Sequence, residues 1–292
     1  MSLSKTGRKT LAWAIALGTL LASATSLAGA RPADDQVKRL CRAAREGRLD
    51  LVRKILQDSG DIVGKTDQFG YTALHWASLC GQLLILEGLL DAGAAVDRAG
   101  GEEGHTALHL AALRGRADII KLLLSRGAAV NIEDRLGRIP IHSAAEAGQA
   151  LSLEILIDHG GMVEARDGEG LTPLHLACRA GHQTVARLLA DHGVAVDPAA
   201  ADGETPLHLA AWSGRCELVK FLLDRGAPID AVDGGGATPL LRASRCGQAA
   251  ATRVLIAAGA DVSIKDGTGR GALDYARLFG FDELAAVLTA RR

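Results

Sequence analysis

Apolar and polar residues follow one another in a short pattern that recurs about every 33 residues. The chain reads TALH at 72–75 and 106–109, IPIH at 139–142, TPLH at 172–175 and 205–208, TPLL at 238–241 and GALD at 271–274, with starts 34 and then 33 residues apart. Thr accepts a hydrogen bond from a backbone N–H of a first helical turn, and Pro at the first helical position lacks only a donor that would have no partner there. Each string therefore predicts the start of a short helix.

Two glycine series of the same period predict where helices end. The first series is Gly47, Gly81, Gly115, Gly148, Gly181, Gly214, Gly247 and Gly280, and the second is Gly60, Gly93, Gly127, Gly160, Gly193, Gly226 and Gly259. Between them lies a second apolar segment, such as IIKLLL at 119–124 after the polar Asp118. Each unit should thus hold two short helices, and turns such as DQFG at 67–70 or DGEG at 167–170 should join it to the next unit.

These strings make the chain resemble the ankyrin-repeat family, which is marked by T-P-L-H-x-A at a 33-residue period. The resemblance implies an all-α solenoid of about eight helix-turn-helix units joined by β-hairpin-like loops, with a concave binding face lined by the turns and first helices. We expect an ankyrin-repeat domain at 31–292, divided into an N-terminal capping repeat (31–66), six internal repeats (67–265) and a C-terminal capping repeat (266–292). Units of this size bury their apolar faces only by stacking on neighbours.

The motif histidine has a structural role in the family, where it hydrogen-bonds between the turns of adjacent units. In this chain it is His75, His109, His142, His175 and His208. The end units depart from the motif: Cys41 stands at the His position of the first unit, and Leu241 and Asp274 stand there in the last two.

Residues 1–30 have the order of a secretory signal peptide. Lys5, Arg8 and Lys9 come before an uncharged apolar run at 11–21, and small residues lead to Ala30. We expect cleavage after Ala30, no membrane attachment afterwards, and a periplasmic or secreted protein. The alternative is an uncleaved anchor, but the apolar run is only about half the roughly 20 residues that a spanning helix needs.

Composition and charge narrow the function classes. The 292 residues carry 33 Lys and Arg against 34 Asp and Glu, so the net charge is −1 and no nucleic-acid partner is indicated. Removing the three basic residues of the first 30 leaves 30 Lys and Arg against 34 Asp and Glu, a net charge of −4.

No pattern in the sequence indicates catalysis, a metal or another cofactor. GDIVGKT at 60–66 has one residue too few between its glycines for a phosphate-binding loop. His159 and His192 occupy equivalent sites about one helix spacing apart, which is wide for two ligands of one metal. Five cysteines remain after cleavage, an odd count, and Cys216 with Cys246 is the one pair to test for a disulfide.

Positions that the repeat motif leaves free should carry the partner specificity. They lie at the turn tips and at the end of each first helix, and aromatic residues and Arg are enriched among binding hot spots. The predicted partner-binding residues are Phe69, Tyr71, Leu79, His105, Leu113, Arg114, Leu136, Arg138, Leu171, Arg179, Trp212 and Arg245, and Glu146 occupies another free position. The alternative for Phe69 and Tyr71 is that each covers the neighbouring turn.

The sequence thus favours a non-enzymatic scaffold, expected to be a monomer, that binds a protein partner on its concave face after export. The partner is not identified by the sequence. A second hypothesis is an exported effector or inhibitor that acts on a foreign target or enzyme, and the place where the mature protein accumulates would separate the two.

Overall fold

The computed structural model describes residues 32–290, and the predicted signal peptide at 1–30 lies outside the described residues. Within this range every named element is helical and no β-strand occurs. The described residues from Gln36 onward are grouped in one compact unit. The all-α solenoid expected from the sequence is confirmed.

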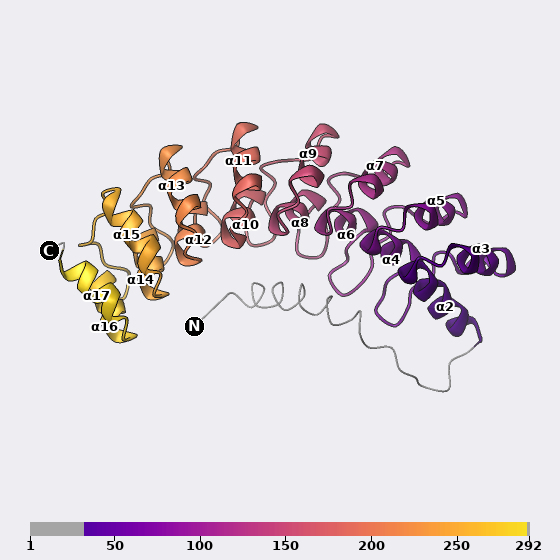
Figure 1. Ribbon diagram of the computed structural model, residues 1–292, viewed down its shortest axis with the longest axis horizontal. Helices are drawn as coiled ribbons and strands as arrows, with labels where there is room; N and C mark the ends of the chain where they lie inside the picture. The colour runs from indigo at the N-terminus through magenta and orange to yellow at the C-terminus, as the bar shows by residue number, and fades with distance from the viewer. Residues whose placement is uncertain (1–31, 291–292) are drawn as a thin grey trace. The chain divides into compact units, whose positions relative to one another are not determined.

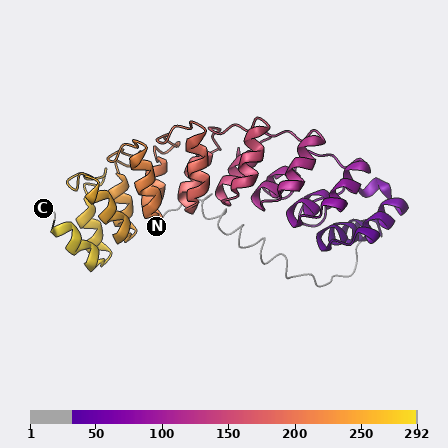
Figure 2. The ribbon, with the colours of Figure 1, turned by 45° about the horizontal axis from the view of Figure 1, so that its top comes forward.

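The helices come in pairs, and the pairs follow one another along an arc (Figures 1 and 2). The first helix of each pair lies on the inner side of the arc and is called inner here; the second is called outer. The inner helices are α2 (Pro32–Glu46), α4 (Ala73–Cys80), α6 (Ala107–Leu113), α8 (Pro140–Glu146), α10 (Pro173–Ala180), α12 (Pro206–Trp212), α14 (Pro239–Arg245) and α16 (Ala272–Leu278). The outer helices are α3 (Leu49–Asp58), α5 (Leu83–Asp91), α7 (Ala117–Ser125), α9 (Ala150–Asp158), α11 (Gln183–Asp191), α13 (Cys216–Asp224), α15 (Ala249–Ala257) and α17 (Asp282–Thr289), and one 3₁₀ turn, η1, covers Gly60–Ile62.

The T-P-L-H strings begin the inner helices as predicted. Thr172 is the extended N-cap of α10, with φ −90° and ψ 166°, and Pro173 takes the first helical position. The hydroxyl of Thr172 donates to Nδ1 of His175 at 2.9 Å. The backbone N–H of Thr172 also donates to Nδ1 of His175 at 3.0 Å. Because both bonds are made within four residues, the start of the helix is fixed by local chemistry.

The first glycine series ends the inner helices for two reasons. Gly148 has φ +71°, in the left-handed region that favours glycine. The ring of His182 in the next repeat also lies where a Cβ of Gly148 would be, and Nε2 of His182 is 3.0 Å from the carbonyl oxygen of Glu146. A side chain at this position would therefore separate two repeats as well as strain the backbone.

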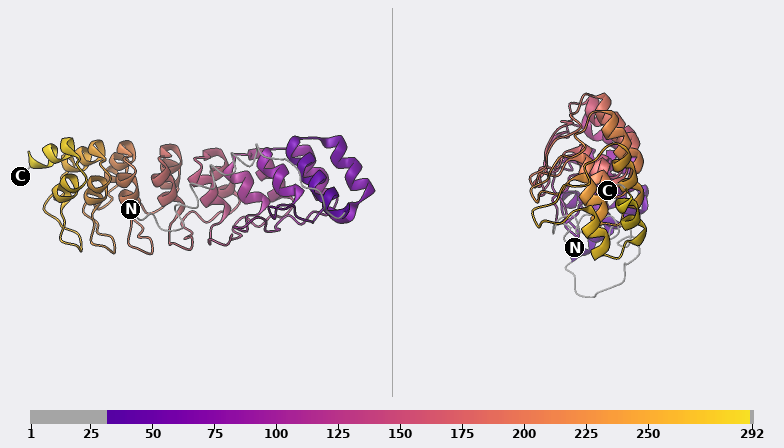
Figure 3. Two further views of the ribbon diagram at one scale, coloured as in Figure 1. Left: turned by 90° about the horizontal axis from the view of Figure 1, so that it is seen from below. Right: turned by 90° about the vertical axis from the view of Figure 1, so that its left-hand side faces the viewer.

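The long loops project together along one edge of the molecule (Figure 3) and hydrogen-bond to each other. Each is closed like a hairpin, as where the N–H of Asp167 donates to the carbonyl oxygen of Leu171 at 2.9 Å. Neighbouring tips are joined as well, because the N–H of Gly168 donates to the carbonyl oxygen of Leu136 at 2.7 Å. The loops thus form a continuous backbone ladder across the repeats.

The core lies between the inner and outer helices and repeats one leucine position along the outer helices. These leucines are at most 2% exposed: Leu89, Leu123, Leu156, Leu189, Leu222, Leu255 and Leu288. Burying each one stabilises the fold by about 2 kcal/mol relative to leaving it in water. Among the described residues no helix has the length and apolar character needed to span a membrane.

The end repeats replace the motif histidine with residues that keep part of its role. The Sγ of Cys41 is 3.6 Å from the carbonyl oxygen of Tyr71, the equivalent of the carbonyl that His109 reaches in the next turn. Asp274 keeps the hydrogen bond to the N-cap backbone, since its Oδ2 accepts from the backbone N–H of Gly271 at 2.9 Å. Leu241 keeps neither, so α14 is capped by Thr238 alone.

Candidate partner-binding surface

A row of non-repeating side chains marks the C-terminal ends of the inner helices. Each stands seven positions after the Thr-equivalent residue of its repeat. We call this set the inner row: Leu113, Glu146, Arg179, Trp212, Arg245 and Leu278. All six are half-buried or exposed, and Leu278 is 58% exposed. The row combines apolar, aromatic and charged groups on the inner side of the arc, where the motif positions are buried.

Four of the predicted partner-binding residues are instead buried in the repeat stack. Tyr71 is 5% exposed, Leu79 4%, Leu171 5% and Arg138 7%. These four side chains are therefore not exposed in the described structure, and their predicted contact with a partner stays a prediction.

Tyr71 takes the covering role that the sequence left as an alternative. Its ring packs edge-on against Trp76, with centroids 5.6 Å apart, and lies over Gly101, where any Cβ would overlap its hydroxyl. Burial raises the pKa of the Tyr71 phenol. Phe69 in the same turn stays 37% exposed and touches Trp76 with one edge.

Arg138 is buried by two ion pairs, one within its own repeat and one to the next repeat. Its guanidinium lies 2.9 Å from Oε2 of Glu146 and 3.4 Å from Oδ2 of Asp167. The other oxygen of Glu146 lies 3.0 Å from Arg179. Glu146 therefore bridges two arginines, and removing any member would leave a poorly solvated charge without its partner. The buried Arg138 holds Glu146 in place, and Glu146 in turn holds Arg179, whose side chain stays partly exposed at the surface.

The other predicted positions differ in their exposure. Leu171 belongs to a buried cluster with Leu176, Ala200 and Leu209. His105 is mostly covered and faces Oδ2 of Asp134 at 3.4 Å. Side chains with solvent access are those of Phe69, Leu113, Arg114, Leu136, Arg179, Trp212 and Arg245. Their role in binding stays a prediction.

Both ring nitrogens of the motif histidines make hydrogen bonds within the fold. Nδ1 of His109 accepts from the backbone N–H of Thr106 at 3.2 Å, so the ring proton is on Nε2, which donates to the carbonyl oxygen of Arg138 at 2.9 Å. Burial lowers the pKa of His109 to about 4, so the ring is neutral at neutral pH. This arrangement agrees with the inter-turn role that the family resemblance implied.

Other reactive side chains are dispersed. No group of three or more His, Cys, Asp or Glu side chains that could hold a metal is found between residues 32 and 290. All five cysteines are free thiols in the structure, including Cys216 and Cys246; Cys41 and Cys178 are buried.

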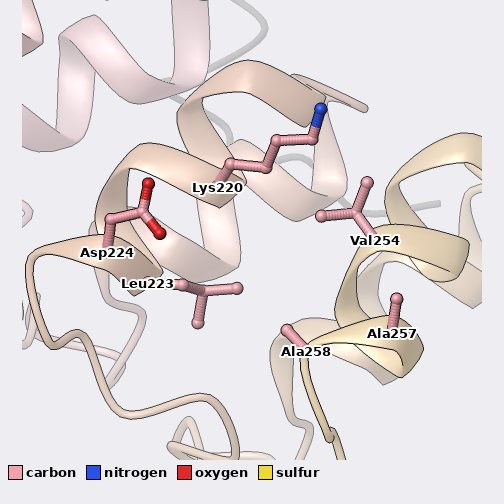
Figure 4. Close-up of a pocket in the computed structure, with 6 residues that line it drawn as sticks. All are labelled: Lys220, Leu223, Asp224, Val254, Ala257 and Ala258. Carbon is pink, nitrogen blue, oxygen red and sulfur yellow. The ribbon is translucent and has the colours of Figure 1, made fainter.

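A shallow cavity of about 270 Å³ opens on the outer side, between α13 and α15 (Figure 4). It is lined by Lys220, Leu223, Asp224, Val254, Ala257 and Ala258. Small residues open it, since Val254 and Ala258 stand where the preceding repeat has Phe221 and Arg225. The cavity contains none of the predicted site residues.

Sequence reasoning missed a set of basic residues in the short loops between inner and outer helices. Arg116 and Arg215 each follow a glycine of the first series and are exposed. An arginine directly after the glycine is visible in the sequence, as in LRGR at 113–116, but these positions were interpreted only as part of the repeat pattern. The inner row also gains Leu278 from the last repeat.

Comparison with known proteins gives one family and two partial relatives. The family model described as "Ankyrin repeats (3 copies)" matches residues 11–99, 40–134, 95–167, 122–200, 141–233 and 197–266. Palmitoyltransferase akr1 of Schizosaccharomyces pombe is 43% identical over 60 residues, which are 20% of this chain and 9% of that protein. BTB/POZ domain-containing protein 3 of the same organism is 37% identical over 59 residues, 20% of this chain and 11% of that protein. The matches thus span about a tenth of each relative.

Proposed function

Because this chain belongs to the ankyrin-repeat family, we propose that it is a scaffold that holds a protein partner against the inner row. The observation that carries the proposal is Trp212, half-exposed on the inner side of the arc. It stands between Arg179 and Arg245 at the same position of neighbouring repeats. Trp and Arg are the residue types most enriched among binding hot spots, and the motif positions around them are committed to the core.

Burial separates the surface from the scaffold beneath it. Phe69 and Leu113 extend the accessible apolar area at the N-terminal half of the arc, whereas Tyr71 and Arg138 support it from below. A partner would therefore contact a rigid surface whose side chains are already ordered, which lowers the entropic cost of binding.

The experiment compares two triple variants as bait in an extract of the source cells, with bound proteins identified by mass spectrometry. The test variant carries Phe69→Ala, Leu113→Ala and Trp212→Ala. The control carries Leu84→Ala, Leu151→Ala and Met162→Ala, three exposed apolar residues outside the inner row. We expect the control to retain the wild-type partner and the test variant to lose it; equal retention by both would overturn the proposed surface.

A non-enzymatic role is part of the proposal. It is supported by the motif histidines, whose two ring nitrogens are both used in hydrogen bonds within the fold. The name of the relative akr1 includes a transferase activity, but the match covers 9% of that protein. Turnover by purified protein in a broad panel of hydrolase and transferase substrates would overturn this part of the proposal.

We further propose that the protein acts after export, in a periplasm or outside the cell. The support is the order of residues 1–30, with basic residues, an apolar run and small residues ahead of Ala30. Cell fractionation with N-terminal sequencing tests it: we expect a mature chain that begins at Arg31. An intact N-terminus on a cytosolic protein would contradict export, and recovery from the medium would favour an effector over a resident scaffold.

A further inference from the structure

The short loops that join inner to outer helices carry a charge opposite in sign to that of the whole chain. They are residues 45–48, 79–82, 113–116, 146–149, 179–182, 212–215, 245–248 and 278–281. Together they contain seven Arg, no Lys and two Glu, while the chain as a whole has net charge −1. Because each loop has the same place in its repeat, these arginines share one edge of the solenoid.

Both acidic residues of this edge are already paired. Glu46 lies 2.8 Å from Arg42, and Glu146 bridges Arg138 and Arg179. Six of the seven arginines make no ion pair with any described carboxylate, and one of the six, Arg45, has its guanidinium 5.6 Å from the ring centroid of Trp76. The other five are Arg48, Arg114, Arg116, Arg215 and Arg245. We call these five the arginine edge. Arg114 is half-buried and the other four are exposed.

Local helix stability does not explain three of these five charges, whereas Arg114 and Arg245 stand at the C-terminal ends of α6 and α14, where a positive charge is favourable. Arg48, Arg116 and Arg215 are the N-cap residues of α3, α7 and α13, and none makes a side-chain cap bond. A positive charge is unfavourable at a helix N-terminus, where the backbone already presents the positive end of its dipole. Residues that are unfavourable for local structure and make no compensating contact are candidates for a functional role.

Packing between repeats does not require the charge either. The side chain of Arg116 lies against Gly81 of the preceding repeat, and that of Arg215 against Gly181. Gln149 fills the same position against Gly115. Since glutamine serves in a neighbouring repeat, the fold needs the length of this side chain and not its charge.

We propose that the arginine edge binds an acidic, extended segment of a protein partner, an inference that rests on the proposed scaffold function. A guanidinium presents paired donors that match a carboxylate, which favours Arg over Lys for this contact. From Arg114 to Arg245 the chain passes four repeat steps, about 32 to 40 Å at helix spacings of 8 to 10 Å. An extended segment of about 12 residues spans that length.

The width of the edge favours a single peptide over a broad anionic surface. Each inner helix of seven or eight residues separates its short loop from the long-loop edge by about 10 to 12 Å. Exposed acids lie along the long loops, among them Glu102, Glu133 and Asp202. A bilayer, or a duplex whose major groove alone is about 12 Å wide, would meet these acids as well as the arginines. One extended chain fits along the arginines alone.

The test uses a fluorescein-labelled 15-residue peptide rich in Glu and its counterpart with Gln at every Glu. The edge variant carries Arg114→Gln, Arg116→Gln, Arg215→Gln and Arg245→Gln. The control carries Arg53→Gln, Lys54→Gln, Lys121→Gln and Lys220→Gln, four exposed residues of outer helices, so that both lose four positive charges. Circular dichroism of both variants checks that each keeps the wild-type fold, as Gln149 leads us to expect for the edge.

We expect the wild type and the control to bind the Glu peptide, and the edge variant to bind it at least tenfold more weakly. The Gln peptide should bind to none of them. Equal loss in the edge variant and the control would overturn the proposal, because net charge and not position would then decide. Stronger binding of anionic vesicles or duplex DNA than of the Glu peptide, with loss in the edge variant, would also overturn it in favour of that ligand.

This outcome is separable from that of the proposed function. Partner capture that depends on Trp212 while the Glu peptide fails to bind would reject only the arginine edge. Peptide binding without Trp212-dependent capture would instead reject the inner row and keep the edge.

Discussion

The Nε2–H of His109 donates a hydrogen bond to the carbonyl oxygen of Arg138, 2.9 Å away in the turn that opens the next repeat. His75 and His175 make the same contact to the carbonyl oxygens of His105 and Glu204 at 3.0 and 3.1 Å. In each case Nδ1 already accepts from the N-cap backbone, so a second ring proton would break that bond. The motif histidine is therefore a neutral link between repeats.

This link predicts that the protein loses stability in mild acid. Burial lowers the pKa of His75, His109 and His175 to about 4, below the value of about 6.5 in an unfolded chain. Between these values the unfolded chain binds more protons, so the free energy of unfolding falls as the pH falls. The slope is about 1.4 kcal/mol per pH unit for each histidine, or about 4 kcal/mol for the three.

Urea denaturation at pH 7, 6 and 5 measures this slope, because Asp and Glu titrate mostly at lower pH. A variant with His159→Gln and His192→Gln is the control, since both side chains are exposed, and it should keep the wild-type slope. A free energy of unfolding that is the same at pH 7 and pH 5 would show that the histidines do not act as neutral links.

Two glycines, one at the end of a repeat and one in the turn that opens the next, separate the cost of backbone strain from that of contact between repeats. Gly127 has φ +86° and open space around it, so Gly127→Ala should cost only the left-handed strain, about 1 to 2 kcal/mol. Gly137 has φ +71°, and a Cβ there would lie 2.9 Å from the backbone nitrogen of Gly168. Gly137→Ala should therefore cost about 1 to 3 kcal/mol more. Equal losses, measured by urea denaturation, would mean that the tips do not pack as described.

The ion pair between Arg242 and Asp233 should be strongly coupled. Nε of Arg242 lies 2.7 Å from Oδ2 of Asp233, whose side chain is 1% exposed. Arg242→Leu should cost about 2 to 4 kcal/mol, because it leaves a buried carboxylate without its partner. The preceding repeat has Ala200 and Leu209 at the two positions, so Asp233→Ala should cost less in the Arg242→Leu background than alone.

A double-mutant cycle for these two substitutions should give a coupling energy of about 1 to 3 kcal/mol. The single variant Leu209→Ala, which removes no charge, checks that the measurement also responds to simple loss of apolar contact. Additive losses in the cycle would contradict the coupling.

Much of the fold was predictable because residues close together in each repeat determine where its helices begin and end. Thr172, Pro173 and His175 determine a helix start through bonds made within four residues, and Gly148 ends a helix through its own backbone. The accessible surface was less predictable because it depends on the next repeat. Tyr71 is buried since Gly101 leaves room for its ring, 30 residues along the chain.

The predictions for arginine residues include the clearest mismatch with the structure and the clearest omission. Arg138 was predicted to contact a partner, but it is buried in ion pairs with Asp167 of the neighbouring turn and Glu146 at a helix end. Arg116 and Arg215 were passed over although their place beside a phased glycine was visible in the sequence. Pairing decides which arginines remain available, and pairing is set by the stacking of repeats.

Amide hydrogen exchange of the protein with and without its captured partner tests the central claim most directly. The account predicts slower exchange on binding at the ends of inner helices α10, α12 and α14, around Arg179, Trp212 and Arg245, and unchanged exchange in the outer helices. Slower exchange confined to the outer helices α11, α13 and α15 would contradict it.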